Sequence, residues 1–348
     1  MTENGKLTKQ ASLAIKGAGI LLMLLHHYLD PNRVQVYDYT SLLFNTDQLQ
    51  ILRDATKVCV PVFVFVSGYG LYESYTRGKL NPGKRVFGLW KHFFPCFLVS
   101  VLLFALFRPQ QFDDLSRFDW LCSALGISQM MNAEPLCTTW WYMSTAYTLV
   151  IFAPLLYYLL NRIDGLAYMG IALLLPGVLY IKYTGDSLLI DWLPAFALGA
   201  LTNKYSLARF LHLKSWSWAL APLTLAIGFI GYQFLQDHGQ REWALTFATA
   251  GVVVTALCLA KAAPLNRLLV FFGRYSNPIF LLHTPLLLCF RGLMHLGHIS
   301  IPLGWLTTLL CATLAAVLVQ KLTDWSEPRL SRLWHSLCRR GTAFLSKG

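Results

Sequence analysis

An apolar segment near the N-terminus carries the residues whose types and spacing best suit chemistry. Lys16 begins the stretch KGAGILLMLLHHY, and His26 and His27 stand near its end. Lys16 and His27 are eleven positions apart, close to three helical turns, so a helix would place both on nearly one face, about 16 Å apart. Ionisable groups inside a membrane span are costly and are functional candidates. Alternatively, Lys16 reaches lipid headgroups and the histidines lie at the opposite interface.

A later apolar stretch, SNPIFLLHTPLLL, contains a further histidine, His283. A neutral imidazole can take the proton of an attacking hydroxyl group, which makes histidine a candidate general base. A single histidine in a span is often only hydrogen-bonded to a neighbouring helix. Together with His27, however, His283 indicates a polar interior shared by several helices.

The amino-acid composition indicates that these groups lie on elements embedded in lipid. The 348 residues are 55% apolar and only 13% charged, whereas soluble domains carry about 25% charged residues. We therefore predict an all-α, polytopic membrane protein with about ten transmembrane helices. A span needs roughly 20 apolar residues. The predicted spans are 10–29, 55–75, 86–107, 139–160, 165–182, 189–203, 216–236, 243–261, 275–293 and 302–322.

The charge distribution predicts the orientation. Of the 29 Lys and Arg residues, 21 fall on the side that holds both termini, and 12 of the 17 acidic residues fall on the other. Positive residues favour the cytoplasmic side, so we expect both termini in the cytoplasm. The net charge of +12 is then explained by topology rather than by nucleic-acid binding, and it makes the cytoplasmic mouth attractive to a polyanionic ligand.

The remaining sequence predicts one membrane domain, residues 1–325, followed by a basic cytoplasmic tail, residues 326–348. Cys122 and Cys137 fall in one loop, and they form a candidate disulfide if that loop faces an oxidising compartment. The sequence contains no Cys or His cluster with the spacing of a metal site, so we predict no bound metal.

Two other spans contain polar groups. The run Ser67-Gly68-Tyr69-Gly70 interrupts the second predicted span, where small residues also serve close helix packing. Basic residues crowd the start of the third span. A cation at a helix entrance can hold a phosphate group, although most of these charges could simply be solvated. The candidates are Lys84, Arg85 and Lys91.

The fourth span opens with three aromatic residues, Trp140, Trp141 and Tyr142. Such residues commonly form an aromatic belt at the membrane interface. The functional alternative is a wall against which a sugar ring stacks through its apolar C–H face.

Taken together, these stretches resemble acyltransferase family 3, the integral-membrane acyltransferases that modify cell-surface glycans, over essentially the whole chain. Lys16 and His27 match a basic residue and a histidine in the first span. The family has two basic positions shortly before a proline in its third span. Lys91 stands at the second of these before Pro95, but Gly88 occupies the first, so Lys84 and Arg85 would take over part of a phosphate-binding role. The other matching residues are Ser67, Gly68, Trp141, Tyr142, Met143, Gly273, Ser276, His283, Glu327 and Pro328.

The resemblance implies an O-acyltransferase in a bacterial inner membrane. It would move an acetyl or other short acyl group from acyl-CoA, used as a substrate rather than a resident cofactor, to a hydroxyl of a cell-surface glycan or lipid-linked sugar. On this basis we expect His27 to be the general base, with His26 as the alternative. We also expect a stand-alone core without the C-terminal esterase-like domain found in some members.

The other expected roles follow from the same hypothesis. Lys16 and Lys91 would hold the phosphates or the carbonyl of the donor. His283 and Glu327 would orient or support the reacting groups, and Ser67 would line the site without being acylated. A transporter or flippase for a glycan or lipid intermediate remains the alternative, although the two halves of the sequence show no matching broken helices of the kind expected for inverted repeats.

Overall fold

The computed structural model describes residues 2–3, 5–29, 45–183, 191–212, 216–234, 241–290, 292, 296 and 300–345, which are almost all helical. Two short strands, β1 (Thr2–Glu3) and β2 (Lys6–Leu7), pair antiparallel at the N-terminus. The helices that build the site are α1 (Lys9–Tyr28), α2 (Thr46–Thr56), α3 (Cys59–Thr76), α4 (Pro82–Phe107), α6 (Trp141–Arg162), α8 (Leu193–Lys204) and α12 (Ser276–Cys289). The others are α5 (Arg117–Leu125), α7 (Gly165–Tyr183), α9 (Trp216–Phe234), α10 (Arg241–Leu259), α11 (Ala263–Arg274), α14 (Ile301–Leu345) and the 3-10 turns η2 (Pro109–Phe112), η3 (Thr138–Trp140) and η4 (Leu207–His212).

Each predicted span coincides with a helix, so the all-α class is confirmed. Within the described residues, four helical stretches are long and apolar enough to cross a membrane by length and composition, namely Lys9–Tyr28, Pro82–Phe107, Thr138–Arg162 and Ile301–Trp325. Four more apolar helices are shorter, at Gly165–Pro176, Ala221–Tyr232, Leu245–Leu259 and Ser276–Cys289. These findings make the chain a membrane protein. The count of ten spans and the cytoplasmic termini stay predictions.

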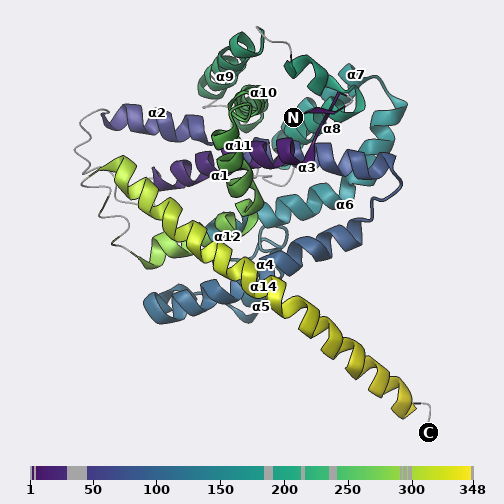
Figure 1. Cartoon of the computed structure of the whole chain (residues 1–348), viewed down its shortest axis with the longest axis vertical. Coiled ribbons are helices and arrows are strands. Elements are labelled where there is room, and N and C mark those ends of the chain that lie inside the picture. Colours follow the sequence, from purple (N-terminus) through teal and green to yellow (C-terminus); the bar gives the residue numbers. More distant parts are fainter. Residues whose placement is uncertain are drawn as a thin grey trace.

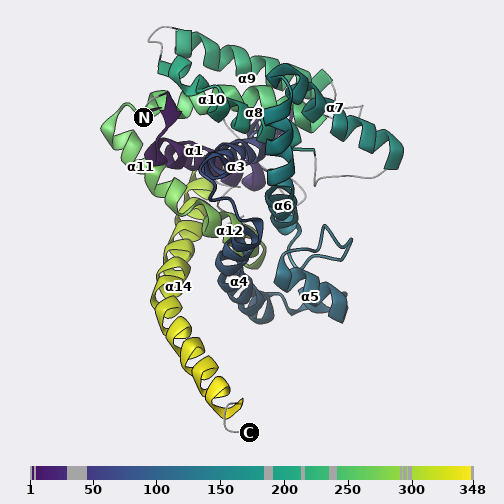
Figure 2. The same cartoon turned by 90° about the vertical axis from the view of Figure 1, so that its right-hand side faces the viewer.

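The outer surface of α14 suits a lipid environment. Leucines recur on it at every fourth position, and all of them are more than half exposed. Positions four apart share one face of a helix, so this stripe would face water unless lipid covered it. The exposed leucines are Leu306, Leu310, Leu314, Leu318 and Leu322. Figures 1 and 2 show α14 running along one side of the molecule, with its C-terminal part projecting beyond the other helices.

Several boundaries differ from the sequence prediction. Helix α3 continues through the run from Ser67 to Gly70, which we had expected to interrupt the span. The reason is close packing, because a side chain at Gly68 would overlap the carbonyl of Phe196 in α8. The predicted span 189–203 contains Pro194, which lies in the first turn of α8, a position where proline needs no backbone donor.

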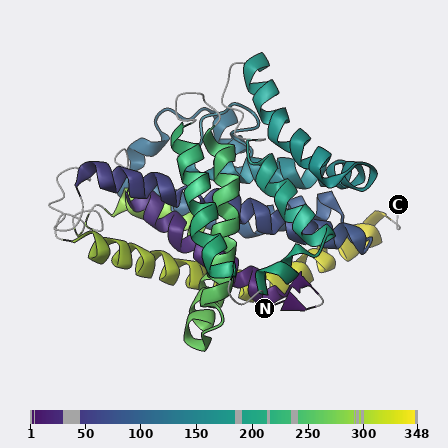
Figure 3. The same cartoon turned by 90° about the horizontal axis from the view of Figure 1, so that it is seen from above.

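Two segments that were predicted to lie outside the spans are helical. Residues 263–274 form α11, which packs against α1 where Gly17 meets the backbone of Leu269 and Gly273 meets that of Leu13. Helix α14 continues without a break to Leu345, so residues 326–345 extend the last helix. Helices α9 and α10 pack side by side through Gly228 (Figure 3).

Helix α1 packs antiparallel against α2 and α3, and this packing sets how far along the axis of α1 each site residue lies (Figure 1). Near one end of α1, His26 lies opposite Arg53. In the middle, Gly19 lies opposite Val62. At the other end, Lys6 forms a 2.6 Å ion pair with Glu73. The N-terminal hairpin therefore closes the end of the bundle that is opposite the histidines.

Candidate active site

A cavity of about 800 Å³ lies between α1, α3, α4, α6, α8 and α12. Its polar lining residues are Lys16, His26, His27, Lys57, Ser67, Lys84, Arg85, His92, Thr139, Trp141, Tyr142, Trp192, Ser276 and Asn277. Four of these are lysine or arginine, and none of the described lining residues is a carboxylate. The cavity therefore has a positive interior that suits an anionic ligand.

The two ends of the cavity differ in chemistry. Lys84, Arg85 and His92, which we call the basic end, come from the start of α4, and Arg85 Nη2 donates to Ser74 Oγ at 2.9 Å near the end of α3. His26 and His27, the histidine end, come from the end of α1. Because α1 and α3 are antiparallel, these groups lie at opposite ends of one continuous space.

The predicted face of α1 is the face that lines this space. Lys16 and His27 both line the cavity, as their spacing along the helix predicted. Glycines and small residues on the rest of α1 allow its neighbours to approach closely, since Gly17 contacts α11 and Gly19 contacts α3. The cation is thus held within the bundle instead of extending toward the lipid headgroups.

His283 belongs to α12 and is completely buried. Its ring centroid lies 4.9 Å from that of His27. Its Nδ1 lies 2.6 Å from the carbonyl oxygen of Phe280, and its Nε2 lies 2.9 Å from Thr284 Oγ1. A carbonyl can only accept, so Nδ1 carries the proton and Nε2 accepts from the threonine hydroxyl. His283 does not line the cavity, but it packs directly behind a residue that does.

His26 is oriented in a different way. Its Nδ1 lies 2.8 Å from the carbonyl oxygen of Arg53, to which it donates. Neutral histidine then presents Nε2 as the acceptor nitrogen. Since His26 and His27 both line the cavity, the structure brings together the predicted base and its alternative.

The basic end contains Lys84 and Arg85 but not Lys91. Arg85, Gly88 and His92 follow a three- and four-residue spacing, so they share one face of α4, and that face is turned toward the cavity. A side chain added at Gly88 would meet no atom within 4 Å, so this position leaves open space between the two basic residues. Lys91 is not among the residues that line the cavity.

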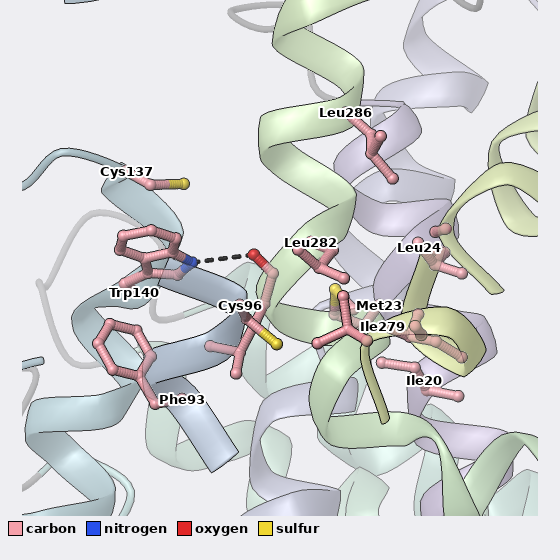
Figure 4. Packing of buried hydrophobic residues seen from close by; sticks show 14 of the residues in the cluster. Ile20, Met23, Leu24, Phe93, Cys96, Cys137, Trp140, Ile279, Leu282 and Leu286 are labelled. Atoms are coloured by element: carbon pink, nitrogen blue, oxygen red, sulfur yellow. Dashed lines mark hydrogen bonds between the residues drawn. The ribbon is translucent and has the colours of Figure 1, made fainter. Parts of the chain in front are cut away.

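Two of the three predicted aromatic residues line the cavity, Trp141 and Tyr142. Trp192, which the sequence did not single out, stacks with Trp141 at a centroid distance of 6.4 Å and is also part of the lining. Trp140 instead lies outside the lining, and its indole Nε1 donates to the carbonyl oxygen of Leu281 at 3.0 Å (Figure 4). This bond ties the start of α6 to α12, two residues before His283.

Ser67 lines the cavity, but its hydroxyl donates to the carbonyl oxygen of Phe63 at 2.9 Å. The hydroxyl of Tyr142 is its other partner. That Ser67 is not acylated stays a prediction. The side chain of Glu327 lies outside the described residues.

The proposed disulfide is not present, because Cys122 and Cys137 are both buried thiols. Cys137 Sγ lies 3.2 Å from Thr139 Oγ1. Cys122 is a buried residue of α5. The loop is held together by other contacts, since Ser123 Oγ accepts from the backbone nitrogen of Leu136 at 3.0 Å.

Sequence reasoning missed Lys57, His92 and Trp192 as lining residues. Lys57 carried a usable signal, because it is an isolated cation directly before the apolar run of the second span, and His92 carried another, because it follows Lys91 shortly before Pro95.

Comparison with known protein families supports what these residues indicate. The profile of the family Acyl_transf_3, described as an acyltransferase domain, matches residues 14–320. The chain belongs to acyltransferase family 3. It is therefore an acyl-transferring enzyme, which decides against the transporter that was the alternative interpretation. Comparison with curated proteins and with solved structures finds no match.

The family match includes every residue that lines the cavity, from Lys16 in α1 to Phe280 in α12. The match ends at residue 320 within α14.

Proposed function

We propose that this acyltransferase moves an acetyl or other short acyl group from acyl-CoA to a hydroxyl of a cell-surface glycan or lipid-linked sugar in the bacterial inner membrane. The single observation that carries the proposal is the shared cavity, which contains the basic end and the histidine end in one continuous space. A cytosolic polyanionic donor and an acceptor arriving from the other face can both reach such a space.

The basic end suits the donor. Coenzyme A carries several phosphate charges, and Lys84, Arg85 and Lys16 supply cations along the cavity. Arginine and lysine bind phosphates through charge-assisted hydrogen bonds. The open space at Gly88 lets a phosphate chain lie against α4 between Arg85 and His92.

The histidine end suits the transfer step. In the proposed reaction His27 removes the proton of the acceptor hydroxyl as its oxygen attacks the thioester carbonyl carbon. The carbon–sulfur bond then breaks, and the departing thiolate takes the proton back from His27. A positioned general base contributes about 10² to 10⁴ in rate. The rings of Trp141 and Tyr142 offer apolar faces for the sugar.

The test is acetyl transfer from labelled acetyl-CoA in membranes that contain the wild type, His27→Gln or His26→Gln. If His27 is the base, its variant loses at least 100-fold in rate while acetyl-CoA still raises the unfolding temperature. At 100 times the dissociation constant a ligand stabilises the folded form by about 2.7 kcal/mol. Full activity of properly inserted His27→Gln protein would reject this assignment.

The donor and the acceptor are tested separately. Absence of any stabilisation by saturating acetyl-CoA would argue against the donor. Mass spectrometry of surface glycans from cells with and without the gene should show a mass difference of one acyl group, and identical spectra would argue against a glycan acceptor.

A further inference from the structure

Lys57 is a cation of the cavity wall that none of the roles above uses. It caps the C-terminus of α2, where its backbone nitrogen donates to the carbonyl oxygen of Asp54 at 3.2 Å, and its half-buried side chain lines the cavity. Its ammonium group lies 5.9 Å from the ring centroid of Tyr232 in α9. Because Tyr232 is not among the lining residues, the charge stands between a buried ring and the open cavity.

The packing of α1 against α2 and α3 gives the depth of Lys57. His26 lies opposite Arg53, and Gly19 lies opposite Val62. Lys57 follows Arg53 by four residues, so it lies about one helical turn, roughly 6 Å, deeper than the histidine end. The cavity at this depth is enclosed by helices, where a charge acts through a lower effective dielectric than in water.

The other cations of the cavity lie farther from the histidines. Lys16 is about 16 Å from His27 along the axis of α1, and Lys84 and Arg85 belong to the opposite end. Among the described lining residues, Lys57 is therefore the lysine or arginine nearest in depth to the groups that would remove the acceptor proton.

We propose that Lys57 stabilises the oxyanion that forms during acyl transfer. The inference rests on the proposed transfer from acyl-CoA. When the acceptor oxygen bonds to the thioester carbon, the π electrons of the carbonyl move onto its oxygen, and the acceptor proton moves to the histidine. The ammonium of Lys57 faces that negative oxygen. When the carbonyl re-forms, the carbon–sulfur bond breaks, the thiolate leaves, and it takes the proton from the histidine.

This role differs from donor binding in what it predicts. An interaction made only in the transition state lowers kcat when it is removed and leaves substrate affinity unchanged. Loss of one oxyanion-stabilising group typically costs about 10² to 10³ in kcat. A cation that only holds the donor phosphates, or only packs on Tyr232, would change the KM for the donor or the unfolding temperature instead.

The experiment compares wild type with Lys57→Met, Lys57→Arg and the control Lys261→Met in detergent-purified full-length protein. Lys261 is an exposed cation outside the cavity lining. We expect Lys57→Met to lose at least 100-fold in kcat with the KM for acetyl-CoA within threefold. Lys57→Arg should recover part of the loss, and Lys261→Met should match the wild type. Folded Lys57→Met protein with an unchanged kcat overturns the proposal.

A binding measurement supplies a second readout. A trifluoromethyl-ketone analogue of the acetyl donor hydrates to a tetrahedral form, whereas the plain methyl-ketone analogue remains trigonal. Wild type should bind the fluorinated analogue more tightly than the plain ketone. In Lys57→Met the ratio of the two affinities should fall at least tenfold, whereas the affinity for the plain ketone should equal that of the wild type. An equal loss for both analogues indicates a donor-binding role and overturns the proposal. A wild type that neither binds nor uses acetyl-CoA would reject the proposed donor, and this inference with it.

Discussion

The proposed phosphate-binding residues offer the sharpest test, because the family pattern and the cavity lining select different residues of α4. The pattern selects Lys91, whereas the cavity is lined by Lys84 and Arg85. We predict that the double variant Lys84→Met/Arg85→Met binds coenzyme A more weakly and that Lys91→Met binds it within twofold of the wild type.

The magnitude follows from exposure. Both lining cations are exposed to solvent, so each interacts with a phosphate about 4 Å away through nearly the dielectric of water, which gives about 1 kcal/mol. Removing both cations should therefore cost about 2 kcal/mol, or roughly 30-fold in the dissociation constant. Arg85 is already positioned by its 2.9 Å bond to Ser74, so little ordering is required on binding.

Isothermal titration with coenzyme A measures this effect, and acetyl transfer gives the KM for the donor. Salt supplies an internal check, since the Debye length falls from about 10 Å at 0.1 M to about 3 Å at 1 M. Wild type in 1 M salt should approach the affinity of the double variant. The reasoning is refuted if Lys91→Met weakens binding tenfold while the double variant behaves like the wild type.

Three further predictions test the surroundings of the site. His283→Asn should lower acetyl transfer by about 10- to 100-fold without changing donor binding, because small misplacements of a catalytic group can cost about 10² in rate; steady-state kinetics with titration checks this. Gly68→Ala should lower the free energy of unfolding by about 1–3 kcal/mol, since the new methyl group meets the carbonyl of Phe196. Denaturant unfolding measures this loss. The control is Gly70→Ala, because a Cβ added at Gly70 meets no atom within 4 Å. Cys122 and Cys137 should both react with a maleimide in unfolded protein without prior reduction, and mass spectrometry counts the added groups.

Much of the fold follows from periodicity and composition. The structure has a helix wherever an apolar run of the sequence predicted a span. The reason is that a lipid-embedded backbone must satisfy its hydrogen bonds within the helix. The joint position of Lys16 and His27 also follows from their spacing alone. The sequence could not predict that α3 runs straight through Ser67 and Gly68, because that depends on the approach of α8.

The cavity lining is harder to predict, since it depends on which way each helix is turned. On α4 the spacing shows that Arg85, Gly88 and His92 share a face, but not that this face meets the cavity. The rotation is set by long-range packing of Phe93 on Trp140, with ring centroids 5.2 Å apart. Lys57 falls near the start of the predicted span 55–75, but the sequence does not show that it faces the cavity, which depends on how the helices pack.

The surroundings of the three histidines indicate how their roles divide. Both ring nitrogens of His283 are engaged, Nδ1 by the carbonyl oxygen of Phe280 and Nε2 by the hydroxyl of Thr284. His283 is thus suited to hold the ring of His27 in place. His26 donates from Nδ1 to the carbonyl oxygen of Arg53, and both α1 histidines border the cavity where a hydroxyl could approach. The proton of the acceptor is therefore expected to move onto α1, because His26 and His27 line the cavity whereas His283 of α12 does not.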